Sequence, residues 1–326
     1  MFSTVYETPF VVDETTTVLP IALTFRPLMA RIGMKLALGA NETPKYVTFT
    51  TDDNVLPTAG TVNADGTFSA SALTNSLTVE TDRKEFTVGL LPVGVASKMS
   101  VHVTTTDGMT YSDKSFQLAG LKRNTHYTMN VPCRTKRFML TVPDGVNSKY
   151  GTGTYGDNGF FQVEPQYDPE SIFDGWHFLR SEIKSDKDAA DGDVLKNRNR
   201  IQLQAVSLGT NRAQNGAFVT PPIQCDGTKT VTVSFTAATH KLTVGSVQYR
   251  IGVTNNGADI SENFLRSFDN IQSSLEGECP WKHSGSVSRT HTFTVTNGQR
   301  IMMKVYSSGG GTPCHLELAD FTYTVE

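Results

Sequence analysis

The 326-residue sequence is poor in charged residues, in tryptophan and in long apolar runs. Charged residues make up 19% of the chain, and the net charge is -3. A chain so close to neutral has no broad basic surface, which argues against binding to nucleic acid or to an anionic membrane. No apolar run approaches the roughly 18 residues that a transmembrane helix needs. The hydrophobic content of 38% is nevertheless that of an ordinary globular protein.

The usual motifs of catalysis and metal binding are also missing. The seven histidines form no HExxH pattern, and there is neither a GxSxG elbow nor a P-loop. A pair of glycosidase carboxylates stays open, because such residues meet only in space. We therefore predict a protein that is not an enzyme and that has no cofactor.

Cysteine is scarce and widely spaced. The four residues are Cys133, Cys225, Cys279 and Cys314. Because no CxxC pair is present, a zinc ribbon or a thioredoxin-like site has no support. Buried thiols and disulfides both remain open, and four cysteines allow three pairings.

A hydrophobic period of two runs through residues 215–237. Val231, Val233 and Phe235 alternate with threonine and serine, and Asp226-Gly227 forms a turn before them. This alternation predicts a strand with one apolar and one polar face. The apolar face needs a second sheet to cover it, which the rest of the C-terminal half would supply.

The N-terminal half has the same rhythm. Ile32, Met34, Leu36 and Leu38 alternate, which favours a strand over a short helix at residues 27–32. Further strands recur about every dozen residues, as in a sandwich or open barrel. The basic stretch 132–137 is interpreted as a solvated linker. The prediction is an all-β protein of two β-sandwich domains in tandem, residues 1–133 and 134–326.

The first domain resembles the fimbrillin-like family of Bacteroidetes surface proteins. The resemblance rests on LTFRPLMARIGMKL at residues 23–36, on LLPVG at residues 90–94 and on a closing strand marked by Leu118, Gly120, Tyr127 and Val131. It implies a cell-adhesion or fimbrium component at the cell surface, associated with the outer membrane. It also implies partners among other fimbrial subunits, joined by donation of a strand to a sheet edge. An upstream half with a lipoprotein signal is expected to be absent from this chain.

The second domain is similar to galactose-binding-like jelly rolls. The matching residues are Asp174-Gly175-Trp176, Thr220-Pro221, Val233-Ser234-Phe235, Trp281, Phe293-Thr294-Val295 and Leu318-Ala319-Asp320-Phe321. The resemblance implies a jelly roll of the kind found in carbohydrate-handling proteins. A sugar site needs an aromatic platform and planar polar groups, which makes Trp281, Lys282, His283 and Trp176 candidate ligand-binding residues. The alternative is that both tryptophans plug the ends of the sandwich.

A structural calcium ion is the one metal that the sequence leaves open. The acidic residues 186–193 do not fit an EF-hand loop, because Ala190 and Asn197 occupy ligand positions of that template. A solvated acidic loop is therefore favoured. By analogy with jelly rolls, Glu317 or Asp320 would supply a late acidic ligand.

The function predicted from these patterns is a non-enzymatic fimbrial or adhesin component whose C-terminal jelly roll faces outward as a binding module for a surface glycan or host protein. The alternative is a glycan-binding module of a surface lipoprotein that captures polysaccharide. An unpaired groove lined with Val, Ile and Leu within residues 1–133 would favour the first function. An exposed Trp281 platform would favour the second.

Overall fold

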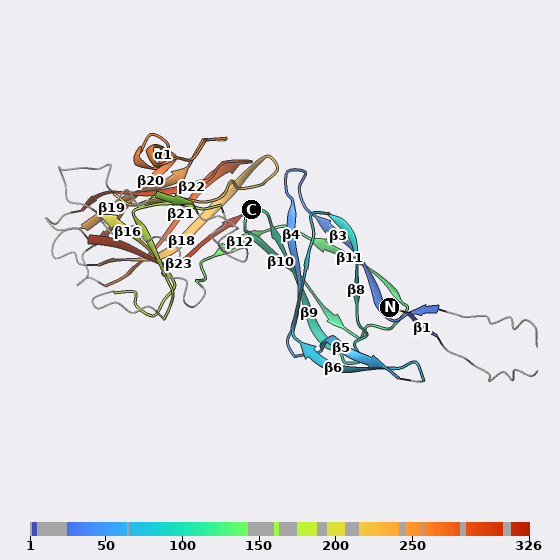
Figure 1. Ribbon diagram of the computed structural model, residues 1–326. Coiled ribbons are helices and arrows are strands. Elements are labelled where there is room, and N and C mark those ends of the chain that lie inside the picture. The colour runs from blue at the N-terminus through green and yellow to red at the C-terminus, as the bar shows by residue number, and fades with distance from the viewer. Residues whose placement is uncertain are drawn as a thin grey trace, which may run out of the picture. The chain divides into compact units, whose positions relative to one another are not determined.

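The computed structural model shows two compact units built almost entirely of β-strands (Figure 1). The structure describes residues 2–4, 25–63, 65–142, 160–162, 175–187, 194–205, 215–240, 246–255, 257–280, 285–308 and 314–326. The first unit comprises Met1–Leu38, Thr43–Thr105 and Tyr111–Arg134, and the second Gly39–Glu42, Thr106–Thr110 and Thr135–Glu326. The prediction of tandem β-sandwiches is confirmed.

The first unit has two principal sheets. One has the strand order β11-β3-β8, and the other contains β10, β9, β4 and β7 in that order. The bounds are β3 Ala30–Ala37, β4 Pro44–Thr51, β7 Ser76–Glu80, β8 Glu85–Leu90, β9 Ser97–Thr105, β10 Thr110–Leu118 and β11 His126–Pro132. Two small antiparallel pairs accompany them, formed by β1 Phe2–Thr4 with β2 Phe25–Pro27, and by β5 Leu56–Val62 with β6 Phe68–Thr74.

The alternation predicted for residues 32–38 places a strand in the core of this unit. In β3, Ala30, Ile32, Met34 and Leu36 are buried, and the residues between them are partly or fully exposed. They pack with Val47, Phe49, Val101 and Val103 of the facing sheet. The helix considered for residues 27–32 does not form. Pro27 ends β2 and Ala30 begins β3, with a bend between them.

The second unit is a sandwich of two antiparallel sheets. In the first sheet β15, β16, β23, β18 and β21 lie in that order, with β12 pairing the C-terminal half of β23. The second sheet has the order β13-β14-β17-β22-β19-β20. The bounds are β12 Lys136–Met139, β13 Phe160–Gln162, β14 His177–Leu179, β15 Ser181–Lys184, β16 Arg200–Ala205, β17 Ala217–Val219, β18 Thr228–His240, β19 Ser246–Val253, β20 Gln272–Pro280, β21 Val287–Thr296, β22 Ile301–Ser308 and β23 Cys314–Val325.

Strands of the second unit alternate between its two sheets. β17, the β19–β20 pair and β22 belong to one sheet, whereas β18, β21 and β23 belong to the other. This crossing pattern is that of a jelly roll. Val231, Val233 and Phe235 of β18 are buried between the sheets, as their alternation predicts.

A short helix, α1 (Glu262–Arg266), is the only helix among the described residues. The Ser261 hydroxyl caps it by accepting a hydrogen bond from the Phe264 amide. Leu265 packs with Leu179, Val219 and Met302 in a separate apolar cluster. In the described part of the chain, no helix has the length and apolar character required to cross a membrane.

The main division between the units falls between Arg134 and Thr135, whereas the sequence predicts residue 133. The second unit also includes two short segments from the N-terminal part of the chain, Gly39–Glu42 and Thr106–Thr110. Neither segment has a sequence pattern that sets it apart from an ordinary turn.

Candidate functional site

The first unit contains a cavity of about 500 Å³ beside β11. Apolar side chains form much of its wall, and polar residues complete it. The lining residues come from β3, β9, β10, β11 and the β10–β11 loop: Ile32, Met99, Lys114, Phe116, Gln117, Ala119, Gly120, Leu121, Tyr127, Thr128, Met129 and Asn130. We call this cavity the β11 groove.

The groove runs along the backbone edge of β11 rather than one face of it. Tyr127 and Met129 pack against the core, whereas Thr128 and Asn130 are exposed, yet all four line the cavity. Since successive residues of a strand point to opposite faces, a wall made of consecutive residues marks the edge of the strand. Among the described strands, β11 pairs only with β3, in parallel, and ends its sheet. Its second edge therefore borders the groove.

The groove combines two kinds of recognition chemistry. The edge of β11 carries backbone amide and carbonyl groups that can extend a sheet. Ile32, Met99, Phe116 and Met129 provide an apolar floor for alternate side chains of an added strand. The hydroxyl of Tyr127 is already engaged, because it accepts a hydrogen bond from the Lys122 amide at 3.0 Å.

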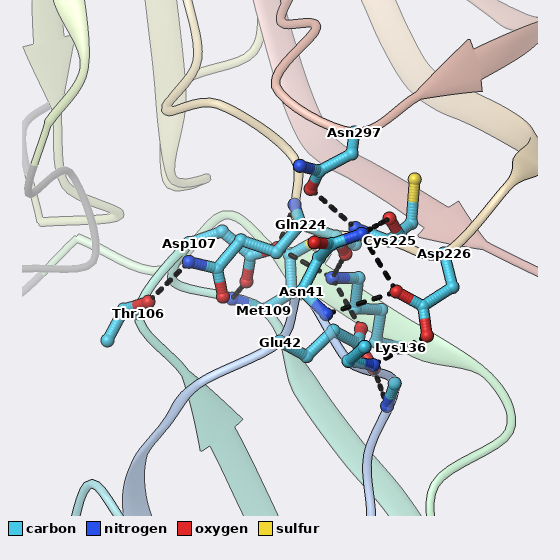
Figure 2. A network of polar contacts seen from close by, with 12 residues as sticks. Asn41, Glu42, Thr106, Asp107, Met109, Lys136, Gln224, Cys225, Asp226 and Asn297 are labelled. Carbon is cyan, nitrogen blue, oxygen red and sulfur yellow. Dashed lines mark hydrogen bonds and ion pairs between the residues drawn. The ribbon is translucent and has the colours of Figure 1, made fainter.

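A second notable feature is a buried charge cluster in the second unit, shown in Figure 2. The Lys136 ammonium is only 1% exposed and lies 3.0 Å from the Glu42 carboxylate and 2.6 Å from that of Asp107. It also donates a hydrogen bond to the carbonyl oxygen of Gln224. Lys136 belongs to the basic stretch interpreted from sequence as a solvated linker, and for this residue that interpretation is wrong. The desolvated ammonium is compensated by two buried carboxylates.

The two short segments that supply these carboxylates, Gly39–Glu42 and Thr106–Thr110, make further polar contacts with residues 224–226. The Asp226 carboxylate accepts hydrogen bonds from the amides of Ala40, at 2.6 Å, and Asn41, at 3.0 Å. The Gln224 amide donates to Asp107 at 3.0 Å, and its side chain donates to Thr106. These contacts join segments far apart in sequence within one unit. They have the closed bonding of a structural cluster.

The sequence makes Trp176 a candidate sugar platform, and the structure corrects this. Its side chain is 0% exposed and lies in an aromatic cluster, with ring centroids 5.0 Å from Phe138 and 5.5 Å from Phe218. A side chain without an open face cannot stack on a sugar. The burial of Trp176 agrees with the alternative that the tryptophans plug the sandwich, and for Trp281, which lies outside the described residues, that alternative stays a prediction.

The other predicted ligand-binding residues, Trp281, Lys282 and His283, lie outside the described residues. The same applies to residues 188–193 of the acidic segment considered for calcium.

The two late acidic residues considered for calcium are held by protein groups. Glu317 is buried and accepts hydrogen bonds from the Leu195 amide at 3.1 Å and the Gln202 side chain at 2.8 Å. Asp320 is ion-paired with Arg198. No group of three acidic, histidine or cysteine side chains suited to a metal occurs among the described residues.

Burial shifts the pKa of several side chains in the second unit. Lys304 is fully buried, and burial lowers its pKa to about 7, helped by Arg266 and Arg180. Its ammonium donates to the Asn215 carbonyl and lies 5.1 Å from the centre of the Phe268 ring. Burial, together with Arg300, lowers the pKa of His177 to about 4. Cys279 is a buried thiol whose pKa burial raises to about 12, so it is not a nucleophile at neutral pH.

A groove in this part of the chain is expected from the sequence if the first function holds, but neither its place beside β11 nor the methionine and aromatic side chains in its lining were predicted. The charge cluster was missed from sequence. The groove depends on the parallel pairing of β3 with β11, which no local pattern reveals. One signal was present, because Tyr127, Met129 and Val131 alternate in the predicted closing strand. For Lys136 the available signal was the alternation of Phe138, Leu140 and Val142, which places residue 136 on the same buried face of its strand.

Comparison with known proteins gives fold likenesses only. No protein-family model matches the chain, and no curated protein matches it in sequence. The C-terminal CBM6 of LamC, a marine laminarinase from Zobellia galactanivorans, has 9% identity and a TM-score of 0.26, covering 46% of this chain and 90% of that one. The K1 cleaved adhesin domain of Lys-gingipain from Porphyromonas gingivalis W83 has 13% identity and a TM-score of 0.30, and the match covers 59% of this chain and 98% of that one. The N-terminal CBM22 tandem of Xyn10C from Paenibacillus barcinonensis has 10% identity and a TM-score of 0.29, and the match covers 88% of this chain and 79% of that one. Likenesses at this level carry no argument about ligand or activity.

Proposed function

We propose that this protein is a non-enzymatic subunit of a cell-surface fimbrial or adhesive assembly. Its first unit accepts a β-strand from a partner subunit in the β11 groove, and its second unit is a binding module. The single observation that supports the proposal is the course of the groove along the edge of β11 that pairs with no other described strand. An added strand would complete both the hydrogen-bond ladder of β11 and the apolar packing beside it.

The partner strand is defined by the chemistry of the groove. Its side chains must alternate between apolar residues, which enter beside Met99 and Met129, and polar residues, which face away. The one charged residue in the groove wall is Lys114. A strand with an acidic residue near Lys114 would therefore be preferred over a basic one.

Binding of extended peptides tests this proposal. Ten-residue peptides with apolar residues at alternate positions should bind the intact protein, and peptides of the same composition with apolar residues at helical spacing should not. Fluorescence anisotropy measures the affinity, and hydrogen exchange at the β11 amides reports where the peptide lies. Met129→Glu should weaken binding at least tenfold, because an uncompensated carboxylate would be buried under the peptide.

Leu73→Glu is the matched control. Leu73 belongs to the same unit, is 51% exposed on β6 and does not line the groove. Its replacement should leave peptide affinity unchanged. If no alternating peptide binds, or if binding leaves exchange at β11 unaltered, the proposal is wrong.

A further inference from the structure

The outer face of β18, β21 and β23 carries a continuous array of small hydroxyl side chains. Five lie on β18, five on β21 and two on β23: Thr228, Thr230, Thr232, Ser234, Thr236, Ser288, Thr290, Thr292, Thr294, Thr296, Thr322 and Thr324. The residues between them on each strand point into the sandwich, as Val231, Phe293 and Tyr323 do. We call this surface the hydroxyl face.

The array is regular in both directions. β18 and β21 pair over ten residues without a register shift, so threonine or serine faces threonine or serine at every outward position. Hydroxyl pairs lie 3.4 Å apart for Thr232 and Thr292, and 3.1 Å apart for Ser234 and Thr290. At the spacings of antiparallel strands the face is about 27 Å long and about 10 Å wide between the outer strand axes.

None of the twelve side chains is charged, and all of them are at least partly exposed. At one end of the face, the Thr236 hydroxyl donates to the Asp320 carboxylate at 3.3 Å and accepts from the Arg198 guanidinium at 3.4 Å. Surfaces designed for solubility are about 25–35% charged, and twelve positions of such a surface would carry about three or four charges. Charged and large side chains begin only at the border. On β12, Arg137 and Met139 stand beside Thr324 and Thr322, and Asp320 pairs with Arg198.

The uniform chemistry restricts the partner. A charged ligand would lose hydration and find no counter-charge. An apolar protein surface would leave the hydroxyls with only one another as hydrogen-bond partners. Each hydroxyl buried without a partner would cost about 1–3 kcal/mol. A suitable partner is uncharged, carries hydroxyls along its length to exchange hydrogen bonds with the array, and has C–H surface to contact the threonine methyls.

We propose that the hydroxyl face binds a neutral polysaccharide whose chain lies along β18 and β21. The length of the array allows one extended polymer to touch many residues, and individually weak contacts then add up along it. This inference rests on the proposed function in one respect, since it names the ligand class of the binding module. It does not depend on the β11 groove.

Pull-down of the intact protein with insoluble polysaccharides tests the inference. The probes are the neutral polymers cellulose, β-1,3-glucan, mannan and chitin, with alginate and polygalacturonate coupled to agarose beads as acidic polymers. We expect binding to at least one neutral polymer and to neither acidic one. Thr292→Glu should weaken it at least tenfold by adding a charge to the centre of the face. Thr232→Val with Thr292→Val should weaken it several-fold, because the shape remains but the hydroxyls are lost.

The control is a similar hydroxyl pair in the first unit, Thr48 and Thr78, whose oxygens lie 3.0 Å apart across β4 and β7. Thr78→Glu makes the same change there and should leave polysaccharide binding unchanged. Thermal unfolding of each variant separates loss of binding from loss of fold.

Three outcomes overturn the inference. They are no binding to any neutral polymer, equal weakening by Thr78→Glu and Thr292→Glu, and self-association of the protein that Thr292→Glu abolishes. The last would assign the face to a second copy of this chain. The peptide test of the β11 groove is independent of all three, so failure here does not count against strand acceptance.

Discussion

Replacement of Lys136 by methionine tests whether the buried charge cluster holds the second unit together. The substitution keeps an unbranched apolar side chain of similar length but removes the cation between Glu42 and Asp107. Two carboxylates that are 7% and 1% exposed then lose their common counter-ion. Breaking a buried pair in this way costs about 3–5 kcal/mol, because the remaining charge is poorly solvated.

The structure favours the lower part of that range. Asp107 keeps hydrogen bonds from the amides of Gln224 and Met109, and Glu42 keeps one from the amide of Gly39. These donors continue to stabilise the carboxylates after the ammonium is lost. We therefore expect Lys136→Met to lower the free energy of unfolding by about 3 kcal/mol. For a unit of this size that corresponds to a fall in Tm of about 6–12 °C.

Differential scanning calorimetry of Lys136→Met and of a matched control measures the effect. Lys35 pairs with Glu85 at 2.9 Å, but their side chains are 65% and 68% exposed. Lys35→Met should therefore cost less than about 1 kcal/mol. Adding Glu42→Gln and Asp107→Asn to Lys136→Met should restore part of the loss by removing the uncompensated charges. Equal small shifts for the two lysine variants would refute the assignment of a buried, stabilising cluster.

Three further predictions concern the core of the second unit. Because folding disfavours protonation of Lys304, whose pKa falls from 10.5 to about 7, the free energy of unfolding should rise by up to about 4 kcal/mol from pH 7 to pH 10.5. In denaturant titrations at several pH values, the free energy of unfolding of the parent minus that of Lys304→Met should rise by this amount over the interval. A difference that does not change with pH would contradict the assignment. Trp176→Ala should destabilise the protein by about 3–5 kcal/mol without changing polysaccharide affinity measured well below the Tm, whereas a selective loss of affinity would reinstate it as a binding residue. Gly216→Ala should cost about 1–3 kcal/mol, because its new Cβ would lie 2.6 Å from the Gln204 nitrogen, whereas Gly94→Ala, with nothing within 4 Å, should be near neutral by the same measurement.

Features that depend only on local alternation are well predicted from the sequence. The buried apolar residues of β3 and β18, and the polar residues between them, could be predicted because each strand has only one face covered by the core. Trp176 was misjudged because its turn-forming neighbours Asp174 and Gly175 suggested exposure. Burial of a side chain next to a turn depends on what the other sheet brings to it, here Phe321 and Tyr323 of β23.

Features that depend on distant pairing were not predictable. The charge cluster joins Glu42, Asp107 and Lys136, which are separated by 65 and 29 residues along the chain, and the local pattern around Lys136 does not identify its two partners. The hydroxyl face was visible in each strand as alternating threonines. Its continuity required the register between β18, β21 and β23.

Membership of Gly39–Glu42 and Thr106–Thr110 in the second unit has a consequence for how this protein can evolve. A genetic crossover near residue 134 would transfer a jelly roll without the acidic partners of Lys136, leaving an orphaned ammonium in its interior. Recombination at that position would therefore destabilise the transferred domain, and the two sandwiches should be inherited together. Exchange of one for a foreign module would first require Lys136 to mutate to an uncharged residue.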